Sequence, residues 1–293
     1  MTHVATLIGP NALDAAALAN VRAALPGASE PQRLGAGAAD ISFSASAGLD
    51  QRGLAEKLRA LAEGVDVVVQ PAANRRKKLF LADMDSTMIG QECIDELADF
   101  AGFKAHVAAI TARAMRGEIA FEPALRERVA LLKGLPTSTI GDVILNRISL
   151  TPGARTLVAT MRANGAFTCM VSGGFTLFTQ PIAAMIGFDE TRANTLVLDG
   201  ELLAGLVSEP IFGRETKRAS LIELRTRLQL AKDDTLVAGD GANDMDMIAE
   251  AGLGVAYHAK PKVAAAAPAR IDHTDLTALL YIQGYRQDEF VAA

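Results

Sequence analysis

The chain has 293 residues, of which 50% are hydrophobic and 22% charged, so it can form a substantial core and is not of the disordered class. Its formal net charge of −5, without a long basic block, argues against nucleic acid as a partner. No run of roughly 18 apolar residues and no signal-peptide pattern occur, so no membrane association is predicted. The two cysteines, Cys93 and Cys169, lack metal-ligand spacing. We therefore expect a soluble cytoplasmic protein with reduced thiols.

Residues 1–70 show the pattern of a separate small domain. Strand-like and helix-like segments alternate over residues 4–8, 12–25, 40–44, 49–62 and 65–69. This order predicts a ferredoxin-like α+β domain and is similar to the ACT family of amino-acid-sensing domains. The turn Gly9-Pro10-Asn11 lacks the charged residue common in ligand-binding members. We therefore expect packing or homodimer formation as the role of this domain, with amino-acid sensing as the alternative.

Residues 71–78 are expected to form a linker. They contain the basic run Arg75-Arg76-Lys77-Lys78. Such a run can bind an anion, but a solvated segment before a buried strand is the simpler interpretation. We therefore predict that these side chains are exposed.

The chain is organised around residues 79–89. The apolar residues 79–82 predict a strand buried on both faces, as in a parallel sheet, and Asp83 and Asp85 follow it directly. If the extended geometry continues, both carboxylates project from the same side. Crowded acids at a strand end repel each other, and a hard cation such as Mg²⁺ compensates for this. The alternative is that the two aspartates only cap a turn.

Residues 90–149 carry helical patterns without strand signals. The predicted helices cover residues 91–100, 104–116, 121–132 and 138–146. A helical block inserted between two strand signals predicts a cap over the Asp83 end of the sheet.

Residues 150–293 return to alternating strands and helices. Together with residues 79–89 they predict an α/β core, a Rossmann-like doubly wound parallel sheet. The strand predicted at residues 166–171 runs into Ser172-Gly173-Gly174, where backbone N–H groups can hold a phosphate. The alternative is a glycine turn with a serine cap.

A second predicted strand, at residues 235–239, also ends in acids. Asp240 and Asp244 follow it with a spacing of four residues. The carboxyl ends of parallel strands share one edge of a sheet, so we expect these acids near Asp83. Lys217, near the start of a predicted helix, is either a solvated lysine or a phosphate ligand.

Taken together, these motifs resemble the four signature motifs of the haloacid-dehalogenase-type phosphatases. They occur in the order Asp83-Met84-Asp85-Ser86-Thr87, Ser172-Gly173-Gly174, Lys217 and Gly239-Asp240-Gly241-Ala242-Asn243-Asp244. The resemblance covers the chain from about residue 79 to its end. Because of Glu92, Phe121 and Arg128, the chain is most similar to the phosphoserine phosphatase family within that superfamily.

The resemblance implies a role for each acid. Asp83 would be the nucleophile that becomes an aspartyl-phosphate, and Asp85 would act as general acid and then general base. Mg²⁺ would bind to the Asp83 carboxylate, the Asp85 backbone carbonyl and Asp240, with Asp244 supporting this shell.

The resemblance also implies two groups of substrate-binding residues. The phosphoryl oxygens would be held by Ser172, Gly173, Lys217 and Asn243. The remainder of the substrate would be bound by Glu92, Phe121 and Arg128, with Glu92 on an ammonium and Arg128 on a carboxylate.

The implied function is Mg²⁺-dependent hydrolysis of O-phospho-L-serine, the last step of serine biosynthesis. One alternative is a phosphatase or phosphotransferase for another small phosphomonoester. An alternative of a different class is a regulatory amino-acid-binding protein with a vestigial catalytic domain. The presence of Asp83, Asp85, Lys217 and Asp240 together argues against this last alternative.

Overall fold

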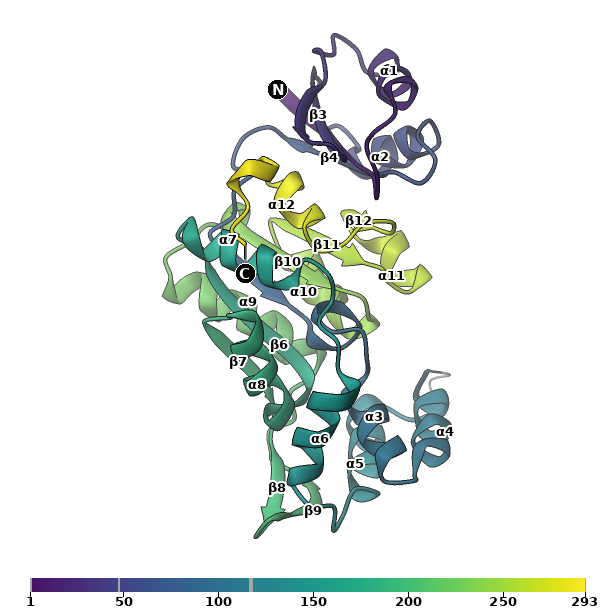
Figure 1. The fold of residues 1–293 in the computed structure, drawn as a ribbon, viewed down its shortest axis with the longest axis vertical. Helices are drawn as coiled ribbons and strands as arrows, with labels where there is room; N and C mark the ends of the chain where they lie inside the picture. Colours follow the sequence, from purple (N-terminus) through teal and green to yellow (C-terminus); the bar gives the residue numbers. More distant parts are fainter. Residues whose placement is uncertain (1, 47, 116–117, 293) are drawn as a thin grey trace.

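The computed structural model describes residues 2–46, 48–115 and 118–292, and within these residues the strands form three sheets (Figure 1). The fold class is as predicted: a doubly wound α/β sheet with a helical cap, preceded by a small α+β domain. The domain boundaries given above remain predictions. The last residue of the helix predicted at residues 104–116 lies outside the described residues.

The N-terminal part contains a four-stranded sheet with two helices on one face. Its elements in chain order are β1 (Thr2–Ile8), α1 (Ala15–Ala23), β2 (Gln32–Gly35), β3 (Ala38–Ser44), α2 (Gln51–Arg59) and β4 (Asp66–Pro71). The strands pair antiparallel in the order β2-β3-β1-β4. Leu18 of α1 and Leu58 of α2 pack with Leu7 and Val67 of the sheet. This is the expected ferredoxin-like arrangement, while the similarity to the ACT family stays a prediction.

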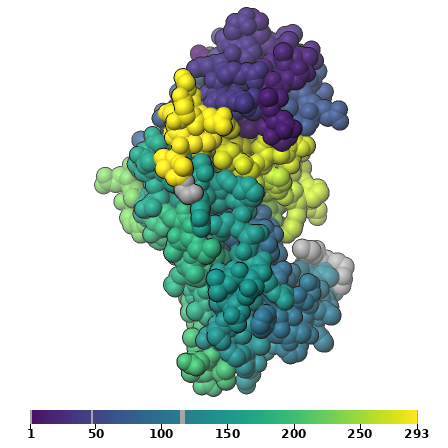
Figure 2. Space-filling model, in the orientation of Figure 1, coloured from purple at the N-terminus to yellow at the C-terminus, as the bar shows by residue number. Residues whose placement is uncertain are grey.

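The second face of this sheet packs on the C-terminal part of the chain. Ile8, Leu34 and Val68 belong to the same apolar cluster as Leu280 and Ile282 of α12 (Ala278–Ile282). Figure 2 shows the N-terminal part, in purple, directly against the C-terminal segment, in yellow. The four-stranded sheet is therefore covered on both faces.

A buried carboxylate fastens this contact. Asp66, the first residue of β4, is fully buried and accepts hydrogen bonds from the loop that precedes α12. The backbone N–H of Asp272 donates at 2.7 Å, and the backbone N–H and hydroxyl of Thr274 donate at 3.1 and 2.7 Å. Several donors to one ionised acceptor make a strong link between segments 206 to 208 positions apart.

The prediction of a solvated linker is wrong for two of its basic residues. The Arg75 guanidinium is partly buried, pairs with Asp40 of β3 and donates to the carbonyl of Ile282 at 3.1 Å. Lys77 is buried, and its Nζ donates to the carbonyl of Asp233 at 2.7 Å. Both side chains satisfy buried acceptors from distant parts of the chain, which explains their burial.

The central sheet has six strands, and all its pairings are parallel. The order is β12-β11-β10-β5-β6-β7. The bounds are β5 (Leu79–Ala82), β6 (Phe167–Phe175), β7 (Glu190–Asn194), β10 (Thr235–Gly239), β11 (Leu253–Tyr257) and β12 (Ala269–Ile271). The sequence patterns did not indicate β7 and β12. Both are edge strands, one mostly polar and one only three residues long, so neither shows a buried-strand pattern.

Helices cover both faces of this sheet. In β5, Phe80 and Ala82 pack toward α7 (Ala154–Ala163) and α8 (Thr176–Ile186). Leu79 and Leu81 pack toward the opposite layer, which contains α9 (Arg214–Arg227), α10 (Met245–Glu250) and α11 (Pro261–Ala266). This alternation is why the four residues of the strand are all apolar. Within the described ranges, no helix is long and apolar enough to cross a membrane.

The order of the strands reverses between β5 and β10. From β5 the chain adds β6 and β7 on one side, whereas β10, β11 and β12 extend the sheet on the other side. Ligands of open parallel sheets bind beyond the carboxyl ends of the strands at such a reversal. The residues that follow β5 and β10 are therefore the first place to look for a site.

The helical cap lies between β5 and α7 in the sequence. It contains α3 (Cys93–Phe100), α4 (Lys104–Met115), α5 (Phe121–Ala130) and α6 (Ser138–Arg147). The two connections to the sheet run side by side, with a bridge between Ile89 and Leu150. A two-stranded hairpin, made of β8 (Leu196–Asp199) and β9 (Leu202–Val207), extends beside α6 (Figure 1).

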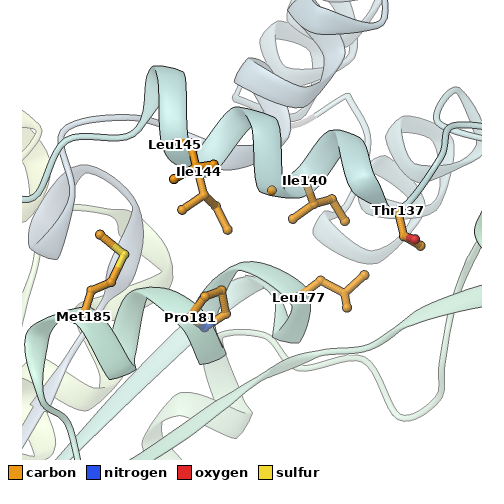
Figure 3. A pocket seen from close by; sticks show the side chains of 8 residues that line it. Thr137, Ile140, Ile144, Leu145, Leu177, Pro181 and Met185 are labelled. Atoms are coloured by element: carbon orange, nitrogen blue, oxygen red, sulfur yellow. The ribbon is translucent and has the colours of Figure 1, made fainter.

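A groove of about 410 Å³ marks one seam between the cap and the sheet layer (Figure 3). It lies between α6 and α8, with Ile140 and Ile144 on one side and Leu177 and Pro181 on the other. The residues that line it include no titratable side chain. The groove is therefore a packing seam and not a centre of acid–base chemistry.

Candidate active site

Asp83 follows β5 at the strand reversal. Its backbone N–H donates to the carbonyl of Ala238 in β10 at 3.0 Å, and its buried carboxylate accepts from the N–H of Met84 at 2.7 Å. The sequence left open whether the chain stays extended after this point, and in the structure it does not. It turns through η1 (Met84–Met88), closed by the N–H of Ile89 on the carbonyl of Met84. The side chains of Asp83 and Asp85 consequently meet different partners.

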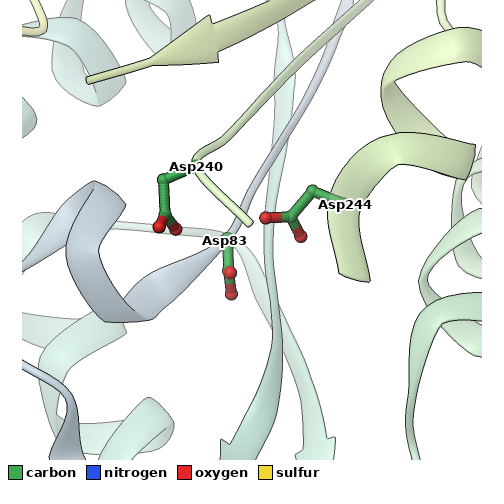
Figure 4. Close-up of side chains that lie close together, drawn as sticks. All are labelled: Asp83, Asp240 and Asp244. Atoms are coloured by element: carbon green, nitrogen blue, oxygen red, sulfur yellow. The ribbon is translucent and has the colours of Figure 1, made fainter. Parts of the chain in front are cut away.

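Three carboxylates converge beyond β5 and β10 (Figure 4). Asp83, Asp240 and Asp244 each offer an oxygen, and these oxygens lie within 4.8 Å of one another. Asp240 directly follows β10, and Asp244 ends the short turn η3 (Ala242–Asp244). The cluster could hold a metal ion, and its oxygen ligands suit a hard cation. Asp244, to which the resemblance gave only a supporting role, therefore offers a ligand oxygen in the same way as Asp83 and Asp240.

One lysine is shared by two of these acids. Lys217 of α9 is fully buried, and its Nζ lies 2.7 Å from an oxygen of Asp83 and 2.7 Å from an oxygen of Asp244. Burial lowers the pKa of Lys217, but Asp244 and Asp83 outweigh burial and raise this pKa above its ordinary value. The lysine therefore remains a fixed positive charge in the site.

The three acids of this cluster share a single buried lysine, which affects how readily they ionise. Burial, followed by repulsion from Asp244, raises the pKa of Asp83 well above its usual range and raises the pKa of Asp240 to about 6. Ionising all three carboxylates beside one lysine would leave an excess of negative charge, which a divalent cation would neutralise. The donor set thus fits a divalent metal.

A glycine makes room for this arrangement. A Cβ atom on Gly239 would lie 2.5 Å from Cγ of Asp244, so no larger residue fits there without moving the carboxylate. The N–H of Gly241 donates to the other oxygen of Asp244 at 3.0 Å. The glycines of this motif therefore bring the backbone and the acid close together.

Asp85 lies between the start of the cap and residues 172–174, which we call the Ser172 loop. One oxygen accepts the N–H of Cys93, the first residue of α3, at 3.1 Å. The other lies 3.1 Å from where a Cβ atom on Gly174 would stand. Burial and then Glu92 raise the pKa of Asp85 to about 7, opposed by the hydrogen bonds from Cys93. A carboxyl group with a pKa near neutrality can both donate and accept a proton.

The strand predicted at residues 166–171 continues further than expected, and the glycine turn that was the alternative does not follow it. β6 continues through Ser172 and Gly173 to Phe175, with a shift in its pairing to β7 after Val171. Ser172 is buried, and its Oγ accepts the N–H of Gly174 at 2.9 Å. The bulge therefore curls the loop around the serine hydroxyl.

The cap contributes Glu92 and Phe121 to the same region. Glu92 accepts a hydrogen bond from the hydroxyl of Ser86 at 2.9 Å. The ring of Phe121 covers two core glycines, since a Cβ atom added to Gly173 or Gly213 would come within 3.5 or 3.2 Å of it. The cap thus lies directly over the Ser172 loop.

Arg128 is the third cap residue predicted from the sequence. Its Nε donates to the carbonyl of Ala124 one turn earlier at 3.2 Å, and the residue is half-buried. Burial lowers its pKa, while the charges of Asp95 and Glu92 act in the opposite direction. Glu92 and Arg128 therefore lie within electrostatic reach of each other. Its neighbour Arg126, by contrast, pairs at the surface with Glu209.

Three further residues lie near the candidate site, one predicted from the sequence and two not predicted. Asn243 is half-buried on η3, with its amide against Gly241. Sequence reasoning missed Lys260, whose Nζ lies 3.8 Å from Asp240, and Asn194, which is buried beside Gly173. No local pattern singles out either residue, because each meets its partners only in the folded chain.

The parallel sheet with acidic residues at its carboxyl edge, the buried lysine and the helical cap are the features to compare with known families. Residues 80–249 match the family model of haloacid dehalogenase-like hydrolases. The chain belongs to this family.

Relatives with a narrower description are also similar to this chain. A phosphoserine phosphatase of Polaromonas sp. is 47% identical over 208 residues, which cover 69% of this chain and 88% of that protein. A structure of a phospho-aspartyl intermediate analogue of phosphoserine phosphatase is 37% identical, with a TM-score of 0.65 over 70% of this chain and 98% of the other. The structure of an HAD family hydrolase from Salmonella enterica serovar Typhi is 27% identical, with a TM-score of 0.86 over 98% of this chain and 99% of the other.

Proposed function

We propose that the protein is a Mg²⁺-dependent phosphatase that hydrolyses O-phospho-L-serine to L-serine and phosphate, as the last step of serine biosynthesis. The observation that carries this proposal is the convergence of Asp83 with Lys217, Asp240 and Asp244, with Asp85 only two residues further on. The names of the relatives support the substrate, and the similarity to an intermediate analogue supports an aspartyl-phosphate.

In the first step, an oxygen of Asp83 attacks phosphorus and the bond from phosphorus to the serine oxygen breaks. Asp85 gives its proton to that oxygen, because a serine alkoxide is a poor leaving group. In the second step, water attacks the phosphoryl group, Asp85 takes a proton from the water, and the bond from Asp83 to phosphorus breaks. The pKa of about 7 for Asp85 suits both directions of proton transfer.

The phosphoryl oxygens require donors and positive charge throughout. Lys217, the hydroxyl of Ser172 and the backbone N–H of Gly173 would hold them, with Asn243 at the edge of the same site. A bound Mg²⁺ would neutralise charge on the phosphoryl group. Asp83 and Asp240 would hold it with the Asp85 backbone carbonyl, and Asp244 would support or complete this set.

Selectivity would come from the cap, because the residues at the sheet edge meet only the phosphoryl group. Glu92 would bind the ammonium of phosphoserine and Arg128 its carboxylate, while Phe121 would cover the substrate. These two charges suit an amino acid better than a neutral phosphomonoester.

The decisive experiment measures turnover of phosphoserine with and without Mg²⁺, beside p-nitrophenyl phosphate and with an alcohol acceptor present. We expect phosphoserine to be preferred, Mg²⁺ to be required and water to be the acceptor. Asp83→Asn should abolish formation of labelled phosphoenzyme, whereas Asp85→Asn should slow turnover at both steps. Labelled phosphoenzyme at the wild-type level in Asp83→Asn would remove Asp83 as the nucleophile.

For the N-terminal domain we propose a packing role, with homodimer formation limited to surfaces that remain open. Its sheet face is covered, so a dimer would use α1 and α2 or the edge strand β2. Amino-acid sensing would instead use the cavity of about 460 Å³ between Gly9 and Val65. Sedimentation with and without L-serine distinguishes these roles.

The free buried thiols Cys93 and Cys169 support a reducing, cytoplasmic location.

A further inference from the structure

Asn194, the last residue of β7, joins two segments of the candidate site. Its side chain is buried, with 2% exposed. Its Nδ2 donates to the carbonyl of Gly173 at 2.8 Å and to the carbonyl of Phe212 at 2.9 Å. Its Oδ1 accepts the N–H of Phe212 at 2.6 Å. One buried amide thus bridges the Ser172 loop and the segment that enters α9.

On the loop side, Asn194 fixes one peptide unit. The carbonyl of Gly173 and the N–H of Gly174 belong to the same planar unit, so holding one end orients the other. That N–H donates to Oγ of Ser172 at 2.9 Å. Because Oγ accepts this bond, the hydroxyl hydrogen of Ser172 is left to be donated elsewhere. The Asn194 amide therefore orients the serine hydroxyl through a single peptide.

On the other side, Asn194 fixes the entry to α9. Phe212 precedes Gly213, the N-cap of the helix, and the N–H of Lys217 bonds to the carbonyl of Gly213 at 3.0 Å. The Lys217 side chain then reaches Asp83 from this first turn. A shift of Phe212 relative to β7 would therefore move the lysine.

We infer that Asn194 is a positioning residue that sets the separation between the Ser172 hydroxyl and the Lys217 ammonium, and so the affinity of the site for a phosphoryl group. This inference rests on the proposed function, in which both groups bind phosphoryl oxygens. It assigns to Asn194 an effect on every phosphate ligand, whatever organic group is attached.

The test uses the full chain with Asn194→Asp and Asn194→Ala. Asn194→Asp keeps the shape and the acceptor for Phe212 but turns the two donated bonds into repulsion with carbonyl oxygens. We expect the inhibition constant of inorganic phosphate to rise about 10- to 100-fold, the scale of a lost charge-assisted contact. The kcat/KM values for phosphoserine and p-nitrophenyl phosphate should fall by a similar factor. Thr191→Val is the matched control, because it removes a partly buried hydrogen bond between β7 and Thr179 of α8, at a position that pairs with Met170 and not with residues 172–174.

A double-mutant cycle separates positioning from general stability. If Asn194 acts through Ser172, the effect of Asn194→Ala on phosphate affinity should be smaller in a Ser172→Ala background. A lowered unfolding temperature with an unchanged inhibition constant would overturn the inference, as would full additivity. If Ser172→Ala alone leaves phosphate affinity unchanged, the proposed phosphate site itself fails, which is a distinct result.

Discussion

Lys217 contacts two of the three clustered carboxylates, so the charge of each buried residue here depends on the others. Its Nζ contacts both Asp83 and Asp244. Asp240 instead has Lys260 Nζ at 3.8 Å and accepts a long hydrogen bond of 3.5 Å from the hydroxyl of Thr87. Removing one partner from such a group leaves the others uncompensated. Substitutions in this cluster should therefore change proton and metal binding before they change shape.

The pH dependence of stability gives a direct check. The folded pKa of Asp240, about 6, lies above its value of 3.8 in a model compound. The folded state therefore holds this proton more tightly, so its stabilisation is present at low pH and is lost as pH rises through about 6. We expect the unfolding temperature of the metal-free protein, relative to Asp240→Asn, to fall between pH 4 and pH 7. Mg²⁺ should raise it more at pH 7 than at pH 5. A difference that grows with pH in the absence of metal would contradict this.

Arg128 tests the origin of selectivity. Arg128→Ala should lower kcat/KM for phosphoserine by roughly 10- to 150-fold, the equivalent of about 1.5–3 kcal/mol for a lost charge-assisted contact. It should spare p-nitrophenyl phosphate, which has no carboxylate to lose. Arg126→Ala on the same helix is the control, because Arg126 pairs at the surface with Glu209. Equal losses for both substrates would make Arg128 a structural residue of the cap.

At the residue scale, the contiguous motifs were predictable and their exact partners were not. Asp83 and Asp85 stand out because they follow an apolar strand, and Asp240 because the pattern repeats. The bend at residues 84–88 was missed, since a positive φ of 56° at Ser86 leaves no composition signal. The roles of the individual site residues remain proposals.

At the scale of elements, the start of α3 holds Asp85, the residue that we propose as the general acid. The N–H of Cys93 is one of the free donors at a helix N-terminus, and it binds Asp85. The cap therefore contacts the candidate site through its backbone as well as through Glu92. Any movement of α3 would also release Asp85.

Cys93→Pro isolates this backbone contact. Proline lacks the N–H but suits the first position of a helix, and Glu92 has φ −98° and ψ 109°, which a following proline accepts. We expect kcat/KM for phosphoserine to fall about tenfold, which is less than the roughly 10²- to 10⁴-fold contribution of a general acid because the Asp85 carboxyl group itself remains. The aryl phosphate, with its better leaving group, should lose less. Cys93→Ala keeps the N–H and serves as the control for loss of the thiol. Equal kinetics for the two variants would exclude a role for the N–H.

The elements themselves were predictable where burial gives them a periodic pattern. The four-residue strand β5 is apolar because both of its faces are covered, and the cap helices have helical spacing. The edge strand β7 reads Glu-Thr-Arg-Ala-Asn and is mostly half-exposed, so its pairing with β6 alone defines it. Tertiary pairing of this kind leaves no signal in a short window.

At the scale of the whole molecule, Asp66 should matter for stability and not for chemistry. Asp66→Asn replaces an acceptor by an amide whose donors would face the N–H groups of residues 272–274. We expect a loss of about 1.5–3 kcal/mol in the free energy of unfolding, measured with denaturant. The kcat/KM for phosphoserine should stay within about twofold. Asp14→Asn, at an exposed helix cap of the same domain, is the control for the change in charge. Unchanged stability would show that the loop holds without Asp66.

The linker shows why docking could not be foreseen. Arg75 and Lys77 look like solvent-exposed residues because the acceptors that bury them are far away in sequence, at Asp40, Ile282 and Asp233. Charge alone does not distinguish a basic residue at the surface from one that satisfies buried carbonyls.

The covered face of the N-terminal sheet also limits how this protein can exchange parts with its relatives. A chimaera joined within residues 71–78 would place a foreign sheet on Tyr281 and Ile282 and would separate Asp66 from the loop at residues 272–274. Transplanting the N-terminal domain together with the last 25 or so residues, by contrast, keeps both sides of the contact. The N-terminal sheet and the segment that contains Asp272, Thr274 and α12 therefore have to be exchanged together, although Asp83, Lys217 and Asp240 lie between them in the sequence.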